Sequence, residues 1–244
     1  MSTLSQRTPA NIEELLRERI LILDGAMGTM VHRLGYQEAD YRGSQFASHP
    51  KDLKNLIDIL CITQPKGIRE IHRQYLEAGA DIIETNTFGA SAMGLAEFGL
   101  QAHVREMNVA AVKLCREVAD YYTAQDPSKP RFVAGSIGPT NKQLSIAGNV
   151  NDPGFRDVTF DQMVDNYYEQ VVTLIEEGVD LLLPETAFDT LVLKACLTAI
   201  ERVFHDKGVK LPVMASFTIF DGGRTLSAQT IEAVWNSIGT ARHG

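Results

Sequence analysis

The chain has 244 residues, enough for one large domain with a buried core; 44% of them are hydrophobic and 22% are charged. This composition excludes a disordered chain and a repetitive fibrous one. The formal net charge is -8, which argues against nucleic acid and anionic membrane surfaces as partners, because both would repel the chain.

Targeting and cysteine patterns point to a cytoplasmic protein. No stretch reaches the ~18 consecutive apolar residues that a membrane span needs, and residues 1–10 contain no apolar signal-peptide core. The three cysteines, Cys61, Cys115 and Cys196, lie too far apart in the sequence for a metal knuckle, and their number is odd. We therefore expect a reducing compartment, no disulfide framework and no metal site among these cysteines.

Five short apolar runs, each ending at polar or glycine residues, predict β-strands. They lie at 20–23, 81–83, 132–134, 180–183 and 212–215. Because every run is continuously apolar, we expect the strands of a parallel sheet that is covered on both faces.

Apolar residues at spacings of three and four predict amphipathic helices between these runs and after the last one. The helical patterns cover 104–121, 164–175, 192–203 and 229–238. The segment 145–157 is rich in glycine, asparagine and proline, which predicts a long loop. The alternation of the two patterns indicates a repeating βα architecture of the α/β class.

The spacing of the runs limits how many βα units fit. They begin roughly 48 residues apart, whereas a closed eight-stranded barrel uses ~30 residues for each unit and ~250 in all. About five units are therefore expected here, which is compatible with an open sheet and with a barrel cut short.

Polar residues follow the predicted strands at the positions where functional groups gather in parallel α/β proteins. Since the carboxyl ends of parallel strands share one face, we expect these side chains to converge on a small polar ligand that carries an amine and a carboxylate. They are Asp24, Glu84, Asn86, Thr87, Ser136, Glu185 and Thr186. The glycine-containing loop 24–29 lacks the spacing of a dinucleotide fingerprint or a P-loop, but its backbone amides suit a carboxylate.

Seven ordered segments resemble the amino-terminal homocysteine-binding domain of cobalamin-dependent methionine synthase. They are 22–30, 38–43, 79–88, 135–141, 151–156, 185–190 and 223–227. The segments 38–43 and 151–156 are more similar to the cobalamin enzyme than to its betaine-dependent relatives.

The resemblance implies a (βα)8 TIM barrel of the homocysteine S-methyltransferase type, of which only about the first five βα units are present. Residues 1–13 would be an N-terminal extension, and 14–244 the partial barrel domain. The implied function is methyl transfer from methylcobalamin, recharged by 5-methyltetrahydrofolate, to the homocysteine thiolate, giving methionine. Folate-binding and cobalamin-binding modules of the full-length family protein are the implied partners.

The resemblance also implies which residues touch the substrate. Asp24, Gly25 and Ala26 would lie against homocysteine, Glu185 would receive its ammonium group, and Asn86 and Thr87 would line the same pocket. No catalytic residue is assigned.

Zinc and cobalamin are the implied cofactors of the full-length family protein. Its zinc is held by one cysteine on the sixth strand and an adjacent pair near the eighth, and none of Cys61, Cys115 and Cys196 matches those positions. We therefore expect no cofactor bound to this chain, and a fragment that is inactive by itself.

Three alternatives stay open at this point. One is a homocysteine S-methyltransferase that uses a betaine or S-methylmethionine type of donor. Another is a barrel hydrolase or lyase in which Glu84 and Glu185 form an acid and base pair. The last is a non-enzymatic module that binds an amino acid or a protein partner.

Overall fold

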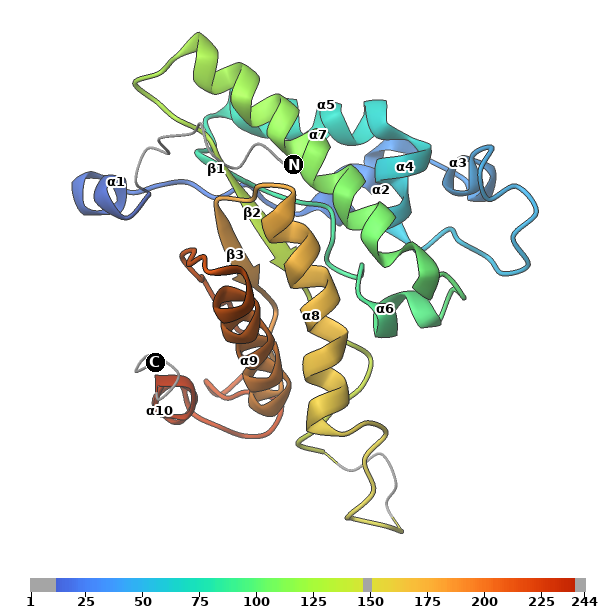
Figure 1. The fold of residues 1–244 in the computed structure, drawn as a ribbon, viewed down its shortest axis with the longest axis vertical. Coiled ribbons are helices and arrows are strands. Elements are labelled where there is room, and N and C mark those ends of the chain that lie inside the picture. Colours follow the sequence, from blue (N-terminus) through green and yellow to red (C-terminus); the bar gives the residue numbers. More distant parts are fainter. Residues whose placement is uncertain (1–11, 147–150, 240–244) are drawn as a thin grey trace.

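Three parallel strands form the sheet of the computed structural model, which describes residues 12–146 and 151–239. In the order β1-β2-β3 they are β1 Ile82–Glu84, β2 Phe132–Ile137 and β3 Leu181–Pro184 (Figure 1). They confirm the strands predicted at 81–83, 132–134 and 180–183, and the α/β class with a parallel sheet.

The strand predicted at 20–23 is wrong. This segment makes one parallel bridge, from Leu23 to Ile82, and its hydrogen bonds to the start of β1 are too few to form a strand. It is also uncovered on one face, since Ile20 is 87% exposed and Ile22 is 57% exposed. The expectation that all the apolar runs are buried on both faces is therefore wrong as well.

The strand predicted at 212–215 is wrong for a similar reason. Val213 makes a single parallel bridge to Leu182, beside β3. The described part of the chain is thus a three-stranded sheet with one bridged segment at each edge, and no pairing between those two segments closes it into a ring. The five-unit barrel that we expected is therefore not confirmed by the described residues.

Helices pack against one face of the sheet, and four of the described helices confirm the helical patterns of the sequence. The confirmed helices are α7 Val104–Gln125, α8 Phe160–Glu176, α9 Thr190–Lys207 and α10 Ile231–Gly239. The others are α1 Ile12–Glu18, α2 Met27–Leu34, α3 Glu38–Arg42, α4 Leu60–Thr63, α5 Pro65–Ala78 and α6 Ala92–Ala96, with 3-10 turns at Ile57–Ile59 and Gln101–His103.

Capping residues in the sequence explain where the long helices begin and end. Thr159 and Gln162 form a reciprocal capping box at the start of α8, and Asp189 accepts two backbone N–H groups at the start of α9. Gly208 ends α9 at a φ of 63°, a conformation that glycine adopts without a steric cost.

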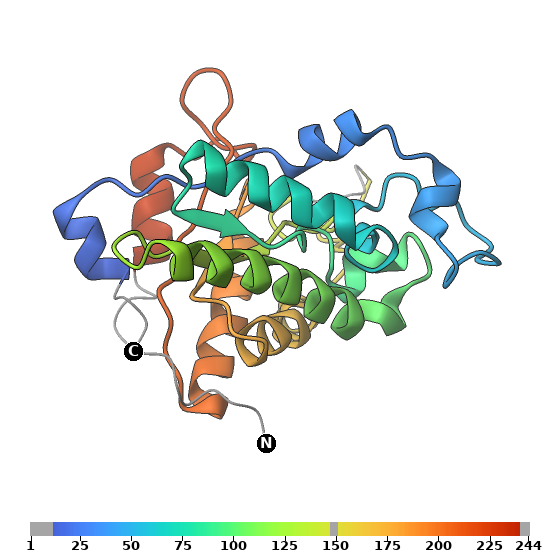
Figure 2. The ribbon, with the colours of Figure 1, turned by 90° about the horizontal axis from the view of Figure 1, so that it is seen from above.

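One face of the sheet is covered by helices. Outward-facing Ile83, Val133 and Leu182 pack in the main core with side chains of α7, α8 and α9. Figure 2 shows α5 and α7 running on either side of β1, and Figure 1 shows α8 and α9 beside β2 and β3. These helices cover the outer face of the sheet. Because side chains alternate along a strand, the neighbouring residues of each strand point to the opposite, inner face.

The inner face of the sheet carries a separate apolar cluster. It contains Ile82, Phe132, Ala134, Leu181 and Leu183, packed against Leu15, Leu21, Leu23 and Met214. Because side chains alternate along a strand, the next inward positions after this cluster are Glu84, Ser136 and Glu185. The strand period thus brings these three polar side chains to one end of the sheet.

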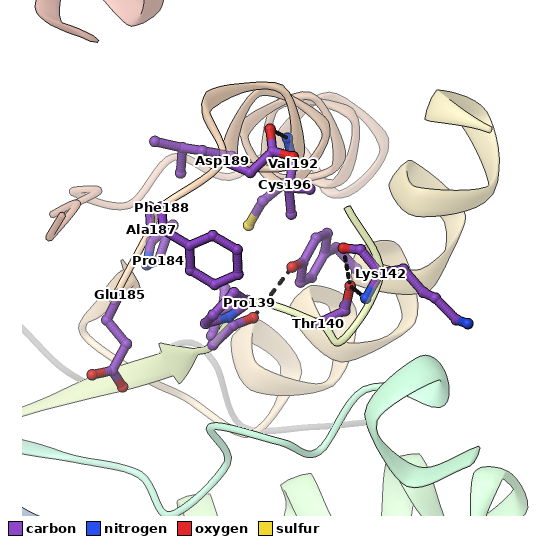
Figure 3. A pocket seen from close by; sticks show the side chains of 14 residues that line it. Pro139, Thr140, Lys142, Pro184, Glu185, Ala187, Phe188, Asp189, Val192 and Cys196 are labelled. Carbon is purple, nitrogen blue, oxygen red and sulfur yellow. Dashed lines mark hydrogen bonds between the residues drawn. The ribbon is translucent and has the colours of Figure 1, made fainter. Parts of the chain in front are cut away.

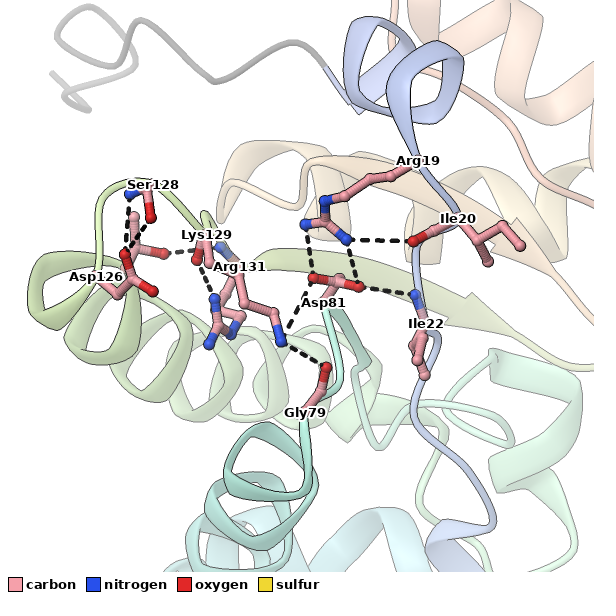
Figure 4. Close-up of polar contacts among 10 residues, drawn as sticks. Arg19, Ile20, Ile22, Gly79, Asp81, Asp126, Ser128, Lys129 and Arg131 are labelled. Carbon is pink, nitrogen blue, oxygen red and sulfur yellow. Dashed lines mark hydrogen bonds and ion pairs between the residues drawn. The ribbon is translucent and has the colours of Figure 1, made fainter.

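An ion pair lies at the opposite end of the sheet, where β1 begins. Both terminal guanidinium nitrogens of Arg19 donate to the buried carboxylate of Asp81, at 3.0 and 2.9 Å, and the same carboxylate accepts the Ile22 N–H at 2.9 Å (Figure 4). These bonds lower the pKa of Asp81, against the effect of its burial. The pair attaches the segment after α1 to the start of β1.

Two sequence expectations fall partly outside the described residues. Most of the predicted extension 1–13 and positions 147–150 of the predicted loop 145–157 are not described, and the domain boundary stays a prediction. The rest of that loop contains no helix or strand. Among the helices described, none combines the length and the apolar character needed to cross a bilayer.

Candidate functional site

A cavity of about 200 Å³ opens at the carboxyl ends of the strands. It brings together five of the six residues that the resemblance implied, Asp24, Gly25, Ala26, Asn86 and Glu185, and also Glu84 and Ser136, which we expected at the strand ends. Thr186, which we also expected there, is not among the lining residues. The remaining lining residues are Met27, Gly28, Ile57, Thr85 and Phe88. None of the lining residues is a lysine, an arginine or a histidine, so the cavity wall has acidic groups and no cationic side chain.

Thr87 lies behind the cavity wall. It is fully buried, and its Oγ1 donates to the Ser136 carbonyl oxygen at 2.7 Å. Gln170 of α8 donates from Nε2 to the Thr87 carbonyl oxygen at 2.8 Å. Thr87 therefore holds the loop after β1 against β2, and the structure does not bring it to the cavity with the other predicted residues.

Asn86 is fixed by contacts beyond its own loop. Its Nδ2 donates to the Ile57 carbonyl oxygen at 2.8 Å and also lies 3.6 Å from the Cys61 sulfur. Both amide hydrogens are thereby directed away from the cavity, so the Asn86 amide oxygen is the group left to face it.

Asp24 is anchored by the backbone of the neighbouring strand. Both of its carboxylate oxygens lie 3.2 Å from the Glu84 N–H. Burial raises the pKa of Asp24 to about 8, with a smaller contribution from the negative charge of Glu185, and the Glu84 N–H opposes the rise.

Glu185 accepts a hydrogen bond from the carboxyl end of the adjacent strand, β2. The Ser136 hydroxyl donates to Glu185 Oε1. Burial raises the pKa of Glu185, and the bond from Ser136 acts in the opposite direction. The ionised carboxylate is thus supported by one donor although it is largely removed from water.

The residue that follows Glu185 has an unusual backbone. Thr186 has a φ of 56°, in the left-handed region that β-branched residues avoid. Its N–H donates to Ser216 Oγ at 3.0 Å, which helps to hold it there. Strain beside a candidate ligand-binding carboxylate is typical of functional sites.

Glu84 is the third carboxyl group at this end of the sheet. Burial raises the pKa of Glu84 to about 8, and the charges of Glu185 and Asp24 add to the increase. Three carboxyl groups therefore share a partly desolvated cavity, which favours a ligand with a positive charge.

The start of α2 contributes backbone donors to the same cavity. Its N-cap residue is Ala26, which offers no side-chain acceptor to the first turn. Met27 and Gly28 of that turn line the cavity. Free N–H groups at a helix start favour an anion such as a carboxylate, so the cavity has an acidic wall and an anion-binding end.

A second, much smaller cavity of about 20 Å³ lies between the ends of β2 and β3 and the helices α8 and α9. This volume suits about one water molecule. Figure 3 shows the carboxyl group of Glu185 turned away from Cys196 and Asp189, which lie at the far side of this cavity. Glu185 therefore acts toward the larger cavity.

The cysteines of the described residues do not fit a zinc ion. Cys61, Cys115 and Cys196 are all buried, and burial raises the pKa of each thiol. Cys115 lies against the neutral ring of His72, at 3.2 Å from Nε2, and the Glu84 carbonyl oxygen, at 3.4 Å. Across 12–146 and 151–239 no group of three or more histidine, cysteine, aspartate or glutamate side chains is arranged so that it could hold a metal ion.

Three lining residues were not predicted from the sequence: Ile57, Thr85 and Phe88. Thr85 and Phe88 lie on the loop after β1, and this position after a predicted strand is a signal that could have identified them. Ile57 lies 29 residues before Asn86 and reaches the cavity through tertiary packing alone.

Comparison with solved structures supports the fold. The metallated form of the homocysteine methyltransferase MmuM from Escherichia coli is 23% identical, with a TM-score of 0.71 over 95% of this chain and 74% of that chain. The oxidized form of the same enzyme is 24% identical, with a TM-score of 0.70 over 93% of this chain and 72% of that one. At this level of identity the likeness establishes the fold.

A match to one protein family extends over almost the whole chain. Residues 21–243 match the family described as homocysteine S-methyltransferase. The match includes every residue that lines the cavity. The chain therefore belongs to the homocysteine S-methyltransferase family.

Proposed function

We propose that the cavity binds homocysteine, with the ammonium group at Asp24 and Glu185 and the carboxylate at the backbone amides of 25–28. The observation that carries this proposal is the pairing of buried carboxyl groups with an uncapped helix start in one cavity whose lining includes no cationic side chain. An α-amino acid supplies both missing charges.

The proposed orientation follows from where these groups lie. An ammonium held between two carboxylates and a carboxylate held by backbone amides fix one end of the substrate, so that its side chain is positioned. Asn86 faces the cavity and Thr87 supports its wall through Ser136. The described residues thus account for the amino-acid end of homocysteine, and the proposal assigns them no part in activating its thiol.

The reaction that we propose for the protein is methyl transfer to the homocysteine sulfur, giving methionine. We take methylcobalamin as the donor because the segments 38–43 and 151–156 resemble the cobalamin enzyme. Folate-binding and cobalamin-binding modules are the partners that this donor requires.

Calorimetric titration with L-homocysteine tests the binding proposal. The expected result is saturable binding by the unmodified protein and at least a tenfold loss of affinity in Glu185→Gln, because that change removes a charged partner of the ammonium. Glu169→Gln, an exposed position on α8, is the matched control and should bind like the unmodified protein.

A second ligand isolates the role of the ammonium. The compound 4-sulfanylbutanoate keeps the thiol and the carboxylate of homocysteine but lacks the ammonium, so it should bind at least tenfold more weakly. Equal affinity for the two ligands, or no binding of homocysteine at all, would show that the proposed function is wrong.

A further inference from the structure

The proposed function uses two carboxyl groups, and the cavity has a third. Glu84 lines the cavity together with Asp24 and Glu185, at the inward position that follows Ile82 on β1. An amino acid brings one ammonium group, so a third ionised carboxylate would be left without a countercharge. Binding of the amino acid by Asp24 and Glu185 therefore leaves the role of Glu84 unexplained.

The hydrogen bonds of the cavity distinguish Glu84 from its two neighbours. Asp24 receives the Glu84 N–H, and Glu185 receives the Ser136 hydroxyl, so both carboxylates have a donor that stabilises the ionised form. In the part of the chain that the structure describes, no hydrogen bond or ion pair reaches the side-chain carboxyl group of Glu84. It is the member of the cluster whose ionised form has no hydrogen-bond donor among the described residues, whereas Asp24 and Glu185 each have one.

The groups that face Glu84 from the packed elements supply no positive charge. Tyr75 of α5 and Cys115 of α7 lie near enough for the charge of Glu84 to raise their pKa values. His72 of α5, which contacts Cys115, is kept neutral because burial lowers its pKa to about 4. Arg33 of α2 and Arg116 of α7 are cations, but they act on Tyr75 and Cys115 and are not among the groups that shift the pKa of Glu84. Asp24 and Glu185 complete the surroundings, and both are acidic.

We propose that Glu84 holds a proton in the free protein and releases it when the ammonium group of an amino acid enters the cavity. This inference rests on the proposed function. A cation between the carboxyl groups removes the repulsion that keeps Glu84 neutral, so the third carboxylate ionises and adds its charge to the binding of the ammonium. The raised pKa of Glu84, about 8, means that the proton is present near pH 7 and absent near pH 10.

The proton release is measured by titrating L-homocysteine into the protein at pH 7 in buffers of different ionisation enthalpy. The unmodified protein should release close to one proton more than Glu84→Gln, because glutamine has none to lose. Any proton that comes from the homocysteine thiol is the same in both proteins and cancels in the difference. Glu169→Gln is the control and should match the unmodified protein.

The affinity for homocysteine should depend on pH because binding releases this proton. Between pH 6 and pH 8 the affinity of the unmodified protein should rise by up to roughly tenfold for each pH unit, and that of Glu84→Gln should rise less steeply. If the unmodified protein binds homocysteine but releases no more protons than Glu84→Gln, the inference is wrong and the proposed function stands. If the unmodified protein does not bind homocysteine, both are wrong.

A measurement on the unmodified protein covers the case in which Glu84→Gln does not fold. Infrared difference spectra recorded on addition of homocysteine should show the loss of a protonated carboxyl band, since the ligand carboxylate is already ionised. Glu84→Asp, which keeps a carboxyl group, should retain the loss but change the frequency of the lost band, which distinguishes Glu84 from Asp24, whose pKa is also raised to about 8. A spectrum in which binding occurs without loss of this band overturns the inference.

Discussion

Ser136 donates its hydroxyl hydrogen to the carboxylate of Glu185 and thereby joins the ends of β2 and β3. Each residue occupies the inward position that follows an apolar layer on its own strand. The bond is the only donor to Glu185 among the contacts of the described residues, so it decides how readily this buried carboxyl group stays ionised.

The first prediction follows from this bond. Ser136→Ala removes the donor, so the pKa of Glu185 should rise further and homocysteine binding should weaken roughly tenfold at pH 7, as expected for a hydrogen bond to a charged group. Calorimetric titration measures the affinity. Ser128→Ala removes a similar hydroxyl bond, to Asp126 at 2.6 Å, on the surface between α7 and β2, and should leave binding unchanged. Equal binding by both variants would contradict the role given to Ser136.

The strained backbone after Glu185 gives a second prediction. Thr186→Gly should raise the free energy of unfolding by about 1 kcal/mol, because glycine adopts a positive φ without the steric cost that a side chain incurs. The same change should weaken homocysteine binding, since a flexible residue holds Glu185 less firmly. Chemical denaturation and calorimetric titration measure the two effects.

Ala228→Gly is the matched control for Thr186→Gly. Ala228 has a φ of 63° and lies outside the cavity, so its replacement should change stability in the same direction and leave binding unaltered. If Thr186→Gly binds homocysteine as tightly as Ala228→Gly does, the strain at Thr186 serves no purpose in the site.

The ion pair at the other end of the sheet gives a third prediction. Arg19→Ala should lower the free energy of unfolding by about 2 kcal/mol, because it leaves the buried carboxylate of Asp81 with fewer donors. The pKa of Asp81 is lowered in the folded protein, so its contribution is present above about pH 4 and is lost as the pH falls below that value.

Arg69→Ala provides the comparison for Arg19→Ala. Arg69 makes a two-pronged pair with Glu117, at 2.8 and 3.0 Å, but both side chains are substantially exposed. Such a pair contributes at most about 1 kcal/mol. Urea denaturation of the two variants at pH 7 should therefore show the larger loss for Arg19→Ala; the opposite order would contradict the importance of burial.

The sequence predicted the inner part of the fold well because its signals are local. Continuous apolar runs mark β1, β2 and β3, which have neighbours on both sides, and the three-and-four spacing marks α7, α8 and α9. The same kind of run failed at 20–23 and 212–215. An apolar run records burial and not pairing, and each of these segments has a hydrogen-bonded neighbour on one side only within the described residues.

The candidate site could be predicted where it follows strand ends. Asp24, Asn86 and Glu185 lie one to three residues after the ends of apolar runs, and the cavity contains all three. Thr87 follows the same rule but donates to the Ser136 carbonyl oxygen behind the wall, a contact that depends on how the loop packs against β2. The position of Ile57 and the φ of Thr186 depend on tertiary packing, which no local pattern records.

The carboxyl cluster gives a fourth prediction, on stability against pH. The pKa values of Asp24 and Glu84 are both raised to about 8 in the folded protein, whereas in the unfolded chain such groups titrate near pH 4. Their contribution to stability is therefore fully present below about pH 4 and is lost as the pH rises through about 8. The free energy of unfolding should fall over this range by up to about 1.4 kcal/mol for each pH unit and each group.

Glu84→Gln separates this cluster from the other ionisable groups. Glutamine stays neutral at every pH, so the variant should lose stability less steeply than the unmodified protein and should be the more stable of the two at pH 9, without ligand. Urea denaturation at intervals from pH 5 to pH 9 measures both curves, and Glu169→Gln should follow the unmodified protein throughout. Parallel curves for Glu84→Gln and the unmodified protein would mean that Glu84 is ionised in the folded state, and the acidic cavity would then need a bound cation even without substrate.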